Sequence, residues 1–285
     1  MLSNLRHLGR VALFLLLALA LRGAQAADRH ALDMGIFPYL STRALLDLYQ
    51  PVRVYLSNEL REPVNLFTAP SFKTYTDQTQ HGIYDIVVTP PHFARLAQRE
   101  AGYIPLVMYT RELRGIVVVA RDSPLQSLQD LKGKRIAMPN RLALVTIMGQ
   151  QLLRDNGLVP AVGVTLLDVT SHTNAVLAVL RGEADAAITE HAALLQMPPD
   201  LRNGVRIIAQ TPPVPHVMYL AHARLGQARI ARLKAALLRF PGTADGRAFL
   251  KEGGFEGMRA VQEADLKNMD PYIKELKHLL DDAQP

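Results

Sequence analysis

Short apolar runs of strand length alternate with stretches of helical periodicity through most of this chain. Residues 32–37, 85–88 and 116–120 are mostly apolar runs that are typical of buried strands. The residues that follow Ser41 place apolar side chains at helical spacing as far as Leu60. Strands and helices that alternate at this pace predict an α/β fold class, with mostly parallel sheets that carry helices on both faces.

The same patterns locate the remaining elements. Ser41 is a suitable N-cap for the first helix, and Pro51 is expected to bend or divide that helix. Gly157 stands where another helix is expected to end. Further strands are predicted at 64–68, 135–138, 164–169, 186–188 and 205–209. Further helices are predicted at 75–81, 92–100, 144–156, 173–181, 229–240, 246–251 and 271–280.

These elements fall into two α/β sets followed by a helical tail, which predicts two lobes with a cleft between them. The chain is expected to cross between the sets near 109–114 and to return near 210–215, where three prolines stiffen it. Lobe 1 is therefore predicted to comprise 27–110 and 213–285, and lobe 2 to comprise 111–212. The charged tail is expected to pack on lobe 1.

The first residues have the pattern of an export signal. Arg6 and Arg10 precede an apolar run at 11–21, and Ala24 to Ala26 match a small-residue cleavage site. The run is shorter than the roughly 20 residues that span a bilayer. We therefore predict a cleaved signal peptide at 1–26 and a protein that acts outside the cytoplasm, with a retained membrane anchor as the alternative.

Charge and composition exclude several classes of function. The chain has 32 Lys and Arg against 26 Asp and Glu, and cleavage removes Arg6, Arg10 and Arg22, which leaves 29 against 26 and a net charge of +3. So small an excess, without a basic cluster, argues against nucleic acid as a partner. Because the chain has no Cys, it has no disulfide, no thiol nucleophile and no thiolate metal site.

Motifs of catalysis and metal binding are missing as well. The nine His residues show no H-x-x-x-H or H-E-x-x-H spacing, so no metal site is predicted. The sequence has no G-x-S-x-G elbow and no glycine-rich phosphate loop of the Walker or Rossmann type. No nucleophile and base stand at catalytic spacing. We predict a binding protein without a cofactor, and an enzyme built on the same fold is the weaker alternative.

Five blocks of residues point to one family. They lie at 35–38, 82–87, 90–94, 127–137 and 171–186, and the last contains Ser171-His172-Thr173-Asn174-Ala175 and Gly182-Glu183-Ala184-Asp185-Ala186. In this order and spacing the blocks resemble the phosphate/phosphite/phosphonate-type periplasmic substrate-binding proteins of ABC transporters. The resemblance implies the type II periplasmic binding fold, two lobes that close on a small solute, and a location in the periplasm.

The resemblance also implies how the cleft would hold an anion. Three helices are placed with their N-termini toward it, those that begin after Thr89, after Asn140 and at Ser171. Free N–H groups and the helix dipole favour negative charge at such positions. Phe37 and Pro90 lie in matching blocks and are expected to line the cleft, and the Thr89 hydroxyl is expected either to reach the ligand or to cap the next helix.

Three further residues match contact positions of the family. His172 matches the cleft histidine that contacts an anionic oxygen, although a histidine that opens a helix can equally cap or pack there. Ser171 is a ligand contact or an N-cap. Glu190 matches loosely an acidic residue that meets a ligand amine, and a second acidic position of the family falls near Val217, so that contact is lost.

The sequence departs from the family at three places. The second-lobe anion loop, usually rich in Ser, Thr and Gly, is here 140–146, where only Thr146 keeps a hydroxyl. Phe72 stands where a cleft tyrosine is usual, and Arg114 stands near another. Arg114 and Arg141 could bind a carboxylate or phosphonate through their planar forks, or could be solvated surface residues.

We therefore predict a solute-binding protein that captures a small anion, phosphonate-like or another organic oxyanion, for an ABC permease in the inner membrane. Phosphate and simple phosphonates are expected to bind poorly because the anion loop has lost its hydroxyls. The alternative is a binding module that reports its ligand to a membrane sensor kinase. A monomer is expected in either case.

Overall fold

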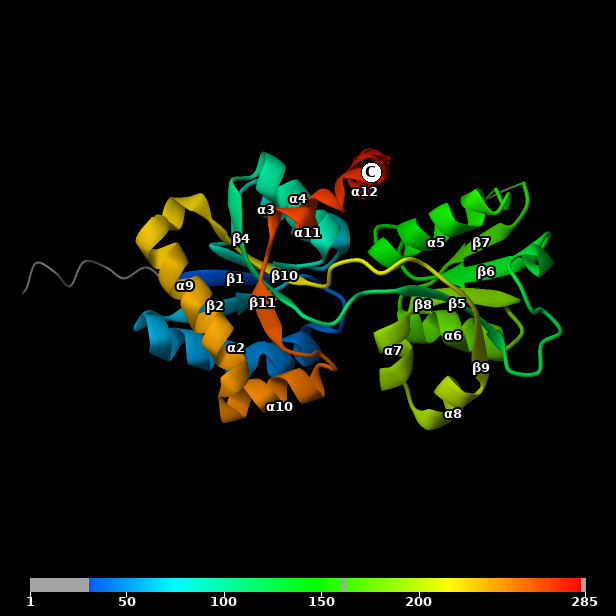
Figure 1. Cartoon of the computed structure of the whole chain (residues 1–285), viewed down its shortest axis with the longest axis horizontal. Coiled ribbons are helices and arrows are strands. Elements are labelled where there is room, and N and C mark those ends of the chain that lie inside the picture. The colour runs from blue at the N-terminus through cyan, green and yellow to red at the C-terminus, as the bar shows by residue number, and fades with distance from the viewer. Residues whose placement is uncertain (1–30, 160–161, 283–285) are drawn as a thin grey trace, which may run out of the picture.

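The structure, a computed structural model, describes residues 31–159 and 162–282. The chain forms two lobes that lie side by side and are joined by two extended segments (Figure 1). This two-lobed α/β architecture is the predicted fold class. The predicted signal peptide at 1–26 lies outside the described residues. Among the described helices, none is both long and apolar enough to cross a membrane.

Lobe 1 is built on a six-stranded sheet of order β11-β4-β10-β3-β1-β2. Its strands are β1 (Leu32–Ile36), β2 (Val64–Phe67), β3 (Ile86–Thr89), β4 (Tyr103–Tyr109), β10 (Met218–His222) and β11 (Met258–Ala260). The central strands are buried on both faces, as their continuous apolar runs require.

Helices cover both faces of this sheet. One face packs against α2 (Thr42–Leu60), α9 (Gln227–Arg239) and α10 (Ala244–Glu252). The other packs against α3 (Phe72–Gln80), α4 (Pro91–Glu100), α11 (Glu263–Lys267) and α12 (Asp270–Asp281). Within β3, Ile86 and Val88 lie in the first core and Val87 in the second, because successive strand side chains point to opposite faces.

Lobe 2 is built on a five-stranded sheet of order β7-β6-β8-β5-β9. Its strands are β5 (Gly115–Ala120), β6 (Arg135–Met138), β7 (Thr165–Asp168), β8 (Ala186–Glu190) and β9 (Val205–Gln210). The helix α5 (Leu144–Asp155) covers one face, and α6 (His172–Leu180) with α7 (His191–Gln196) and α8 (Pro199–Asn203) covers the other.

The chain passes between the sheets twice, at 110–114 and 211–217. Leu113 and Val214 pair there in an antiparallel bridge, with N–H···O distances of 2.9 and 3.0 Å. The first strand reached after each passage, β5 or β10, lies antiparallel to both of its neighbours. The sheets are therefore mixed, a detail that the expectation of mostly parallel sheets left out. This division of strands supports the proposed lobe boundaries.

Local signals account for most helix ends. Ser41, Ser71 and Ser171 each accept a hydrogen bond from a backbone N–H three residues later, as N-caps do. Gly157, with φ of 75°, follows α5 in the left-handed conformation that favours glycine. Of the two outcomes expected at Pro51, division does not occur, since α2 continues through it. Tyr49 and Val52 on either side of Pro51 are fully buried in the core of lobe 1.

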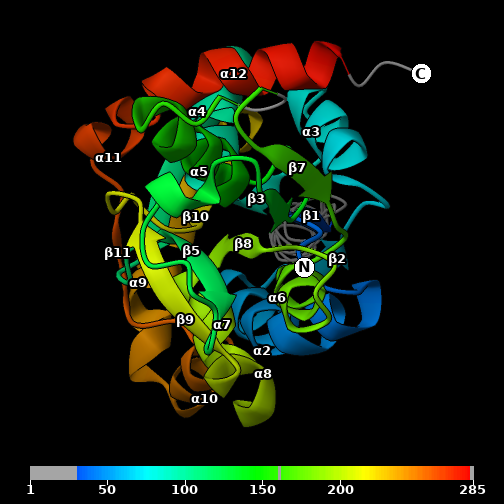
Figure 2. The same ribbon diagram turned by 90° about the vertical axis from the view of Figure 1, so that its right-hand side faces the viewer.

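The tail departs from the expectation of a cap on lobe 1 alone. The helix α12 contacts both α4 of lobe 1 and α5 of lobe 2, and it crosses one edge of the molecule above both helices (Figure 2). Met269, at its N-cap position, is fully buried with Leu144 and Met148 of α5. The tail therefore bridges the two lobes.

Candidate functional site

A cavity of about 410 Å³ lies between the lobes, and both lobes line it. From lobe 1 and its tail it is lined by Phe37, Pro38, Tyr39, Leu40, Leu48, Phe72, Pro90, Val217, Glu252, Gly253, Gly254 and Phe255. From lobe 2 and the crossing segments it is lined by Leu113, Pro139, Asn140, Ala143, Leu144, Val145, Thr170, Ser171, His172, Thr173, Glu190, Ala192, Ala193, Gln196, Met197, Pro198 and His216.

The lobe 1 wall is largely aromatic. Phe37 follows β1, and its ring lies 4.3 Å from that of Phe72 and 5.3 Å from that of Phe93, measured between centroids. Phe255 approaches from the tail and stacks on Tyr109 with parallel rings 4.0 Å apart. Packed rings of this kind form a rigid apolar surface against which the body of an organic ligand can lie.

A chain of buried hydroxyl groups supports this wall. The Tyr39 hydroxyl, which belongs to a cavity-lining residue, donates to Tyr49 at 3.4 Å. Tyr49 is 3.4 Å from Tyr109, which is 2.9 Å from Tyr219. Burial raises the pKa of each of these phenols above its ordinary value. All four are therefore neutral, and they hold the wall by hydrogen bonds rather than by charge.

The lobe 2 wall presents the N-termini of two helices. At α6, Ser171 accepts from Asn174 N–H at 3.2 Å, and the first hydrogen bond within the helix starts at Ala175. The backbone N–H groups of His172 and Thr173 come before this first bonded N–H, so they have no partner within the helix. At α5 the same is true of Leu144 and Val145, because Thr146 and Ile147 donate to Ala143.

The third helix expected at the cleft, α4, contributes its N-cap residue Pro90 to the lining from lobe 1. All three helix N-termini that the sequence placed at the cleft therefore supply lining residues. Their dipoles favour negative charge in the cavity.

His172 is held as a neutral hydrogen-bond donor. Its Nδ1 atom accepts from the backbone N–H of Glu190 at 3.4 Å and lies 3.1 Å from the Thr189 hydroxyl. Because Nδ1 accepts, the ring proton is assigned to Nε2. Burial lowers the pKa of His172 below its ordinary value, against the opposing charge of Glu190. A neutral ring with Nε2–H can donate to an anionic oxygen.

Glu190 is an ionised carboxylate on the same wall. Its Oε1 atom lies 3.4 Å from Nε2 of His216, a residue that is 5 % exposed. Burial alone would raise the pKa of Glu190, but the hydrogen bond from His216, together with the nearby charge of Arg111, holds that pKa below its usual value. Glu190 can therefore accept a hydrogen bond from a donor on the ligand.

Six of the ten predicted site residues lie around the cavity. They are Phe37, Phe72, Pro90, Ser171, His172 and Glu190. Ser171 also serves as the N-cap of α6, so both of the roles considered for it are compatible with its position.

The structure does not bring the other four predicted side chains into the cavity. Thr89 is fully buried beneath the wall, and the Thr146 hydroxyl donates to the Pro139 carbonyl at 3.0 Å. Arg114 pairs with Glu112 at 3.0 Å, and Arg141 donates to the Leu279 carbonyl at 3.5 Å. Both guanidinium groups therefore have partners that do not line the cavity, and neither arginine is among its lining residues.

The cavity therefore has an unusual charge pattern for an anion site. Among the described residues that line it there is no Lys or Arg, whereas two carboxylates, Glu190 and Glu252, do line it. Attraction for an anion must come from backbone N–H groups, helix dipoles and His172. No group of three or more His, Asp or Glu that could hold a metal occurs among the described residues.

Several lining residues were missed by sequence reasoning. Tyr39 carries no motif, and only its place after β1 could have marked it. His216 stands next to Val217, where the second acidic position of the family falls, and no sequence signal indicated that it pairs with Glu190. The segment 252–255 approaches from the far end of the chain, and no local pattern could have placed it here.

Comparisons with solved structures identify the same fold. XAC2383 from Xanthomonas citri, bound to chloride, superposes with a TM-score of 0.75 and 21% identity over 87% of this chain and 99% of that protein. PhnD1 from Prochlorococcus marinus, in complex with methylphosphonate, superposes with a TM-score of 0.76 and 17% identity over 89% of this chain and 99% of that protein. A binding protein component of an ABC phosphonate transporter from Pseudomonas aeruginosa superposes with a TM-score of 0.72 and 16% identity over 90% of this chain and 100% of that protein.

At these identities the likeness establishes the type II binding-protein fold. No curated protein matches the sequence significantly. The model of one family does match, over residues 34–266, which is most of the chain and includes both lobes and both cavity walls. The chain belongs to the family of periplasmic substrate-binding proteins of phosphonate ABC transporters.

Proposed function

We propose that this protein captures a small organic anion in the periplasm and delivers it to an ABC permease in the inner membrane, without catalysing a reaction. The proposal rests on the family and on one observation: helix N-termini from both lobes and the Nε2–H of His172 line a single cavity. The family consists of transport receptors, which favours a transport partner over a sensor kinase.

The charge pattern of the cavity supports a singly charged anion. Neutral N–H donors stabilise negative charge without a full positive charge opposite it. The carboxylates of Glu190 and Glu252 repel additional negative charge on the ligand. An organic monoanion with an apolar body fits these conditions, because Phe37, Phe72 and Phe255 line the opposite wall. Inorganic phosphate, which has no apolar part and carries more charge, fits them less well.

Candidate headgroups follow from the same argument. PhnD1 binds methylphosphonate, and a similar fold from Xanthomonas axonopodis, with a TM-score of 0.59 and 18% identity, binds the sulfonate MOPS. A phosphonate monoester, a sulfonate and a carboxylate each offer oxygens to the donors at α5 and α6. We propose that a donor group on the ligand's body, where present, bonds to Glu190.

A thermal-shift screen tests the proposal. Methylphosphonate, ethanesulfonate, butyrate and inorganic phosphate are added to the mature chain, after bound solutes have been removed by unfolding and refolding. An anion at about 100 times its Kd stabilises the protein by about 2.7 kcal/mol, which raises Tm by about 5–10 °C. A rise with an organic anion but not with phosphate supports the proposal.

The His172→Ala variant serves as the control. The rise is expected to be much smaller in this variant, because the only side-chain donor assigned to the anion is gone. No rise with any organic anion in the unsubstituted protein, or an equal rise in the variant, would count against the proposed site. A rise with phosphate alone would show that charge, not the organic body, is recognised.

A further inference from the structure

A loop of lobe 2 is inserted into the core of lobe 1. The loop 139–143 connects β6 to α5, and the side chain of Leu142 is 4 % exposed. Leu142 packs in a cluster with Phe37, Phe93 and Met218, and the other buried members of that cluster come from lobe 1 and its tail. Separation of the lobes would expose this leucine and leave a void in lobe 1.

A hydrogen bond between the lobes joins the same residue. The Nε2 atom of His92, at the start of α4 in lobe 1, lies 3.0 Å from the Leu142 carbonyl oxygen. Because a carbonyl only accepts, Nε2 carries the ring proton. His92 is fully buried, and its Nδ1 atom has no partner among the described residues. His92 thus donates its Nε2 proton to the hydrogen bond between the lobes.

The loop is fixed within lobe 2, so it cannot follow lobe 1 when the lobes separate. The Leu142 N–H donates to Oδ1 of Asn140 at 2.9 Å, and the Ala143 N–H donates to the Asn140 carbonyl at 2.8 Å. The Thr146 hydroxyl holds the Pro139 carbonyl at 3.0 Å. These bonds give a set shape to the loop, which has lost the hydroxyl-rich sequence usual in the family.

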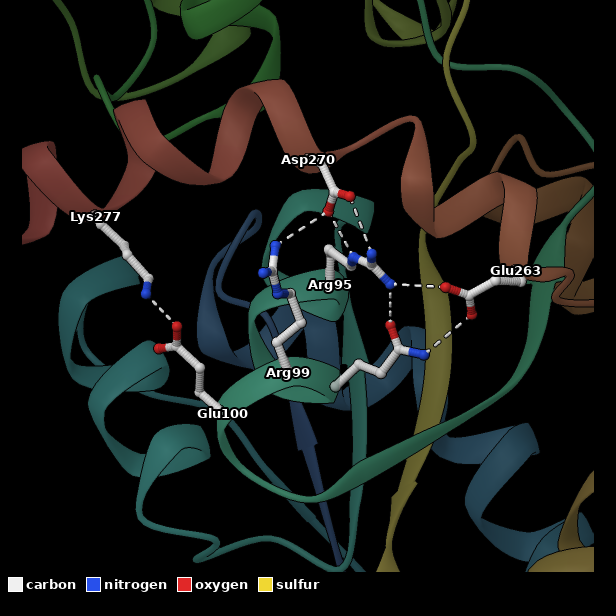
Figure 3. Close-up of polar contacts among 7 residues, drawn as sticks. Arg95, Arg99, Glu100, Glu263, Asp270 and Lys277 are labelled. Atoms are coloured by element: carbon white, nitrogen blue, oxygen red, sulfur yellow. Dashed lines mark hydrogen bonds and ion pairs between the residues drawn. The ribbon is translucent and has the colours of Figure 1, made fainter.

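The tail adds a second contact between the lobes next to the first. Arg95 of α4 donates to both carboxylate oxygens of Asp270 at 2.7 and 3.0 Å, and Lys277 of α12 pairs with Glu100 (Figure 3). Glu263 accepts from Arg95 at 3.0 Å. These ion pairs bind α11 and α12 to lobe 1.

The opposite side of α12 meets lobe 2. Met269 is fully buried among Leu144, Val145 and Met148 of α5, and Tyr272 packs against the same group. Arg141 of the loop donates to the Leu279 carbonyl near the end of α12. The loop and the start of α5 are thus held between α4 on one side and α12 on the other.

We propose that the loop 139–143 and α12 form an interlobe latch, in which Leu142 and Met269 hold the cleft closed through contacts of the protein with itself. The latch goes beyond the proposed function, because it sets the balance of closed and open forms without any solute. Opening then requires Leu142 to leave the lobe 1 core and the His92 hydrogen bond to break.

Distance measurements between the lobes test the latch. The chain has no Cys, so Asp47→Cys on α2 and Asp200→Cys on α8, both exposed, give two unique sites for spin labels. Pulsed electron paramagnetic resonance is recorded on protein freed of solutes by unfolding and refolding. The labelled protein that carries only these two cysteine substitutions serves as the unsubstituted reference. It is expected to show mainly the short distance between labels that belongs to the closed form.

Leu142→Ala is expected to lower the closed-to-open ratio by about 30-fold or more, since removal of a buried leucine side chain is costly. Leu153→Ala is the matched control, because Leu153 lies on the same helix as Leu144 but is buried within the lobe 2 core alone. The control should lower stability and leave the distance unchanged. In the open form Leu142 has already left the core of lobe 1, so Leu142→Ala destabilises only the closed form. The free energy of unfolding should therefore fall less in Leu142→Ala than in Leu153→Ala.

Two results would overturn the latch: an open distance in the unsubstituted protein, or a Leu142→Ala variant with the same distances as that protein. Should Leu142→Ala fail to fold, His92→Leu tests the other half of the contact by the same measurement, with an opening shift expected and an unchanged distance contradicting the proposal. None of these measurements uses a ligand, so a failed solute screen does not bear on them.

Discussion

Replacing Arg95 with methionine should destabilise the protein through the tail. The substitution keeps an apolar side chain of similar length and removes the guanidinium group, which bonds to Asp270 and Glu263. Those two carboxylates belong to α11 and α12, whereas Arg95 belongs to α4. The variant therefore reports how much this ion-pair network contributes to holding the tail on lobe 1.

The magnitude follows from burial. The Arg95 side chain is 10% exposed, whereas Asp270 and Glu263 are 40% and 55% exposed. An exposed ion pair contributes about 0.2–1 kcal/mol, and loss of one partner of a buried pair costs about 3–5 kcal/mol. Because water can hydrate both carboxylates once the arginine is gone, we expect a loss of about 2 kcal/mol, which lowers Tm by about 4–8 °C.

Urea unfolding of Arg95→Met and the unsubstituted protein measures this loss. Arg99→Met is the control, since Arg99 is 53% exposed and reaches Asp270 only at 3.4 Å. The control should change stability by less than about 0.5 kcal/mol. If Arg95→Met is as stable as the control variant, the network does not hold the tail and the reasoning fails.

The same pair of proteins should differ in their response to acid. The hydrogen bond from Arg95 holds the pKa of Asp270 below its ordinary value, against the opposing effect of burial. A lowered carboxyl pKa stabilises the folded state above the unfolded pKa of about 3.9, and this stabilisation is lost as the pH falls through the folded pKa. The stability difference should therefore be constant near pH 7 and shrink below about pH 4.

Three further outcomes are expected. His172→Ala should weaken binding of the best organic anion about 10- to 100-fold by calorimetry while the protein stays folded, since one hydrogen bond to a charged group is lost; an unchanged Kd would remove His172 from the site. Burial lowers the pKa of His92 to about 4, so the folded state resists protonation and stability should fall as the pH drops from about 6.5 to about 4; denaturant titrations of His92→Gln should show a smaller slope than the unsubstituted protein, and an equal slope would contradict the prediction. Gly149→Ala would place a Cβ atom 2.7 Å from Cδ1 of Ile188 and should cost about 1–3 kcal/mol in chemical unfolding, and an unaffected variant would mean that α5 can shift.

Much of the secondary structure was predictable because its signals are local. The run at 135–138 became β6 with the same bounds, and Ser41 capped α2 as expected. The strands β4 and β10 were not predicted as elements. Residues 218–222 form a strand because β3 and β4 flank them on both sides, and those neighbours are far away in the sequence.

The positions of some candidate site residues were likewise predictable from the sequence, whereas those of others were not. Ser171 and His172 open a helix after a strand, so their place at a sheet edge was readable from the chain. The orientation of the Arg114 and Arg141 side chains could not be predicted from the sequence, because a long side chain turns toward whichever partner the fold supplies. Here the partners are Glu112 and the carbonyl of Leu279.

The sequence by itself determined the alternation of strands and helices and the two crossings between lobes, and the family resemblance placed three helix N-termini at the cleft. Hydrophobic periodicity and capping act over a few residues, so they can be recognised without the fold. Only the tertiary structure decided that Glu190 faces His216, that Leu142 enters lobe 1 and that α12 reaches both lobes. Such contacts join residues distant in the chain, and their energy depends on burial and distance, which arise only when the two lobes are brought together.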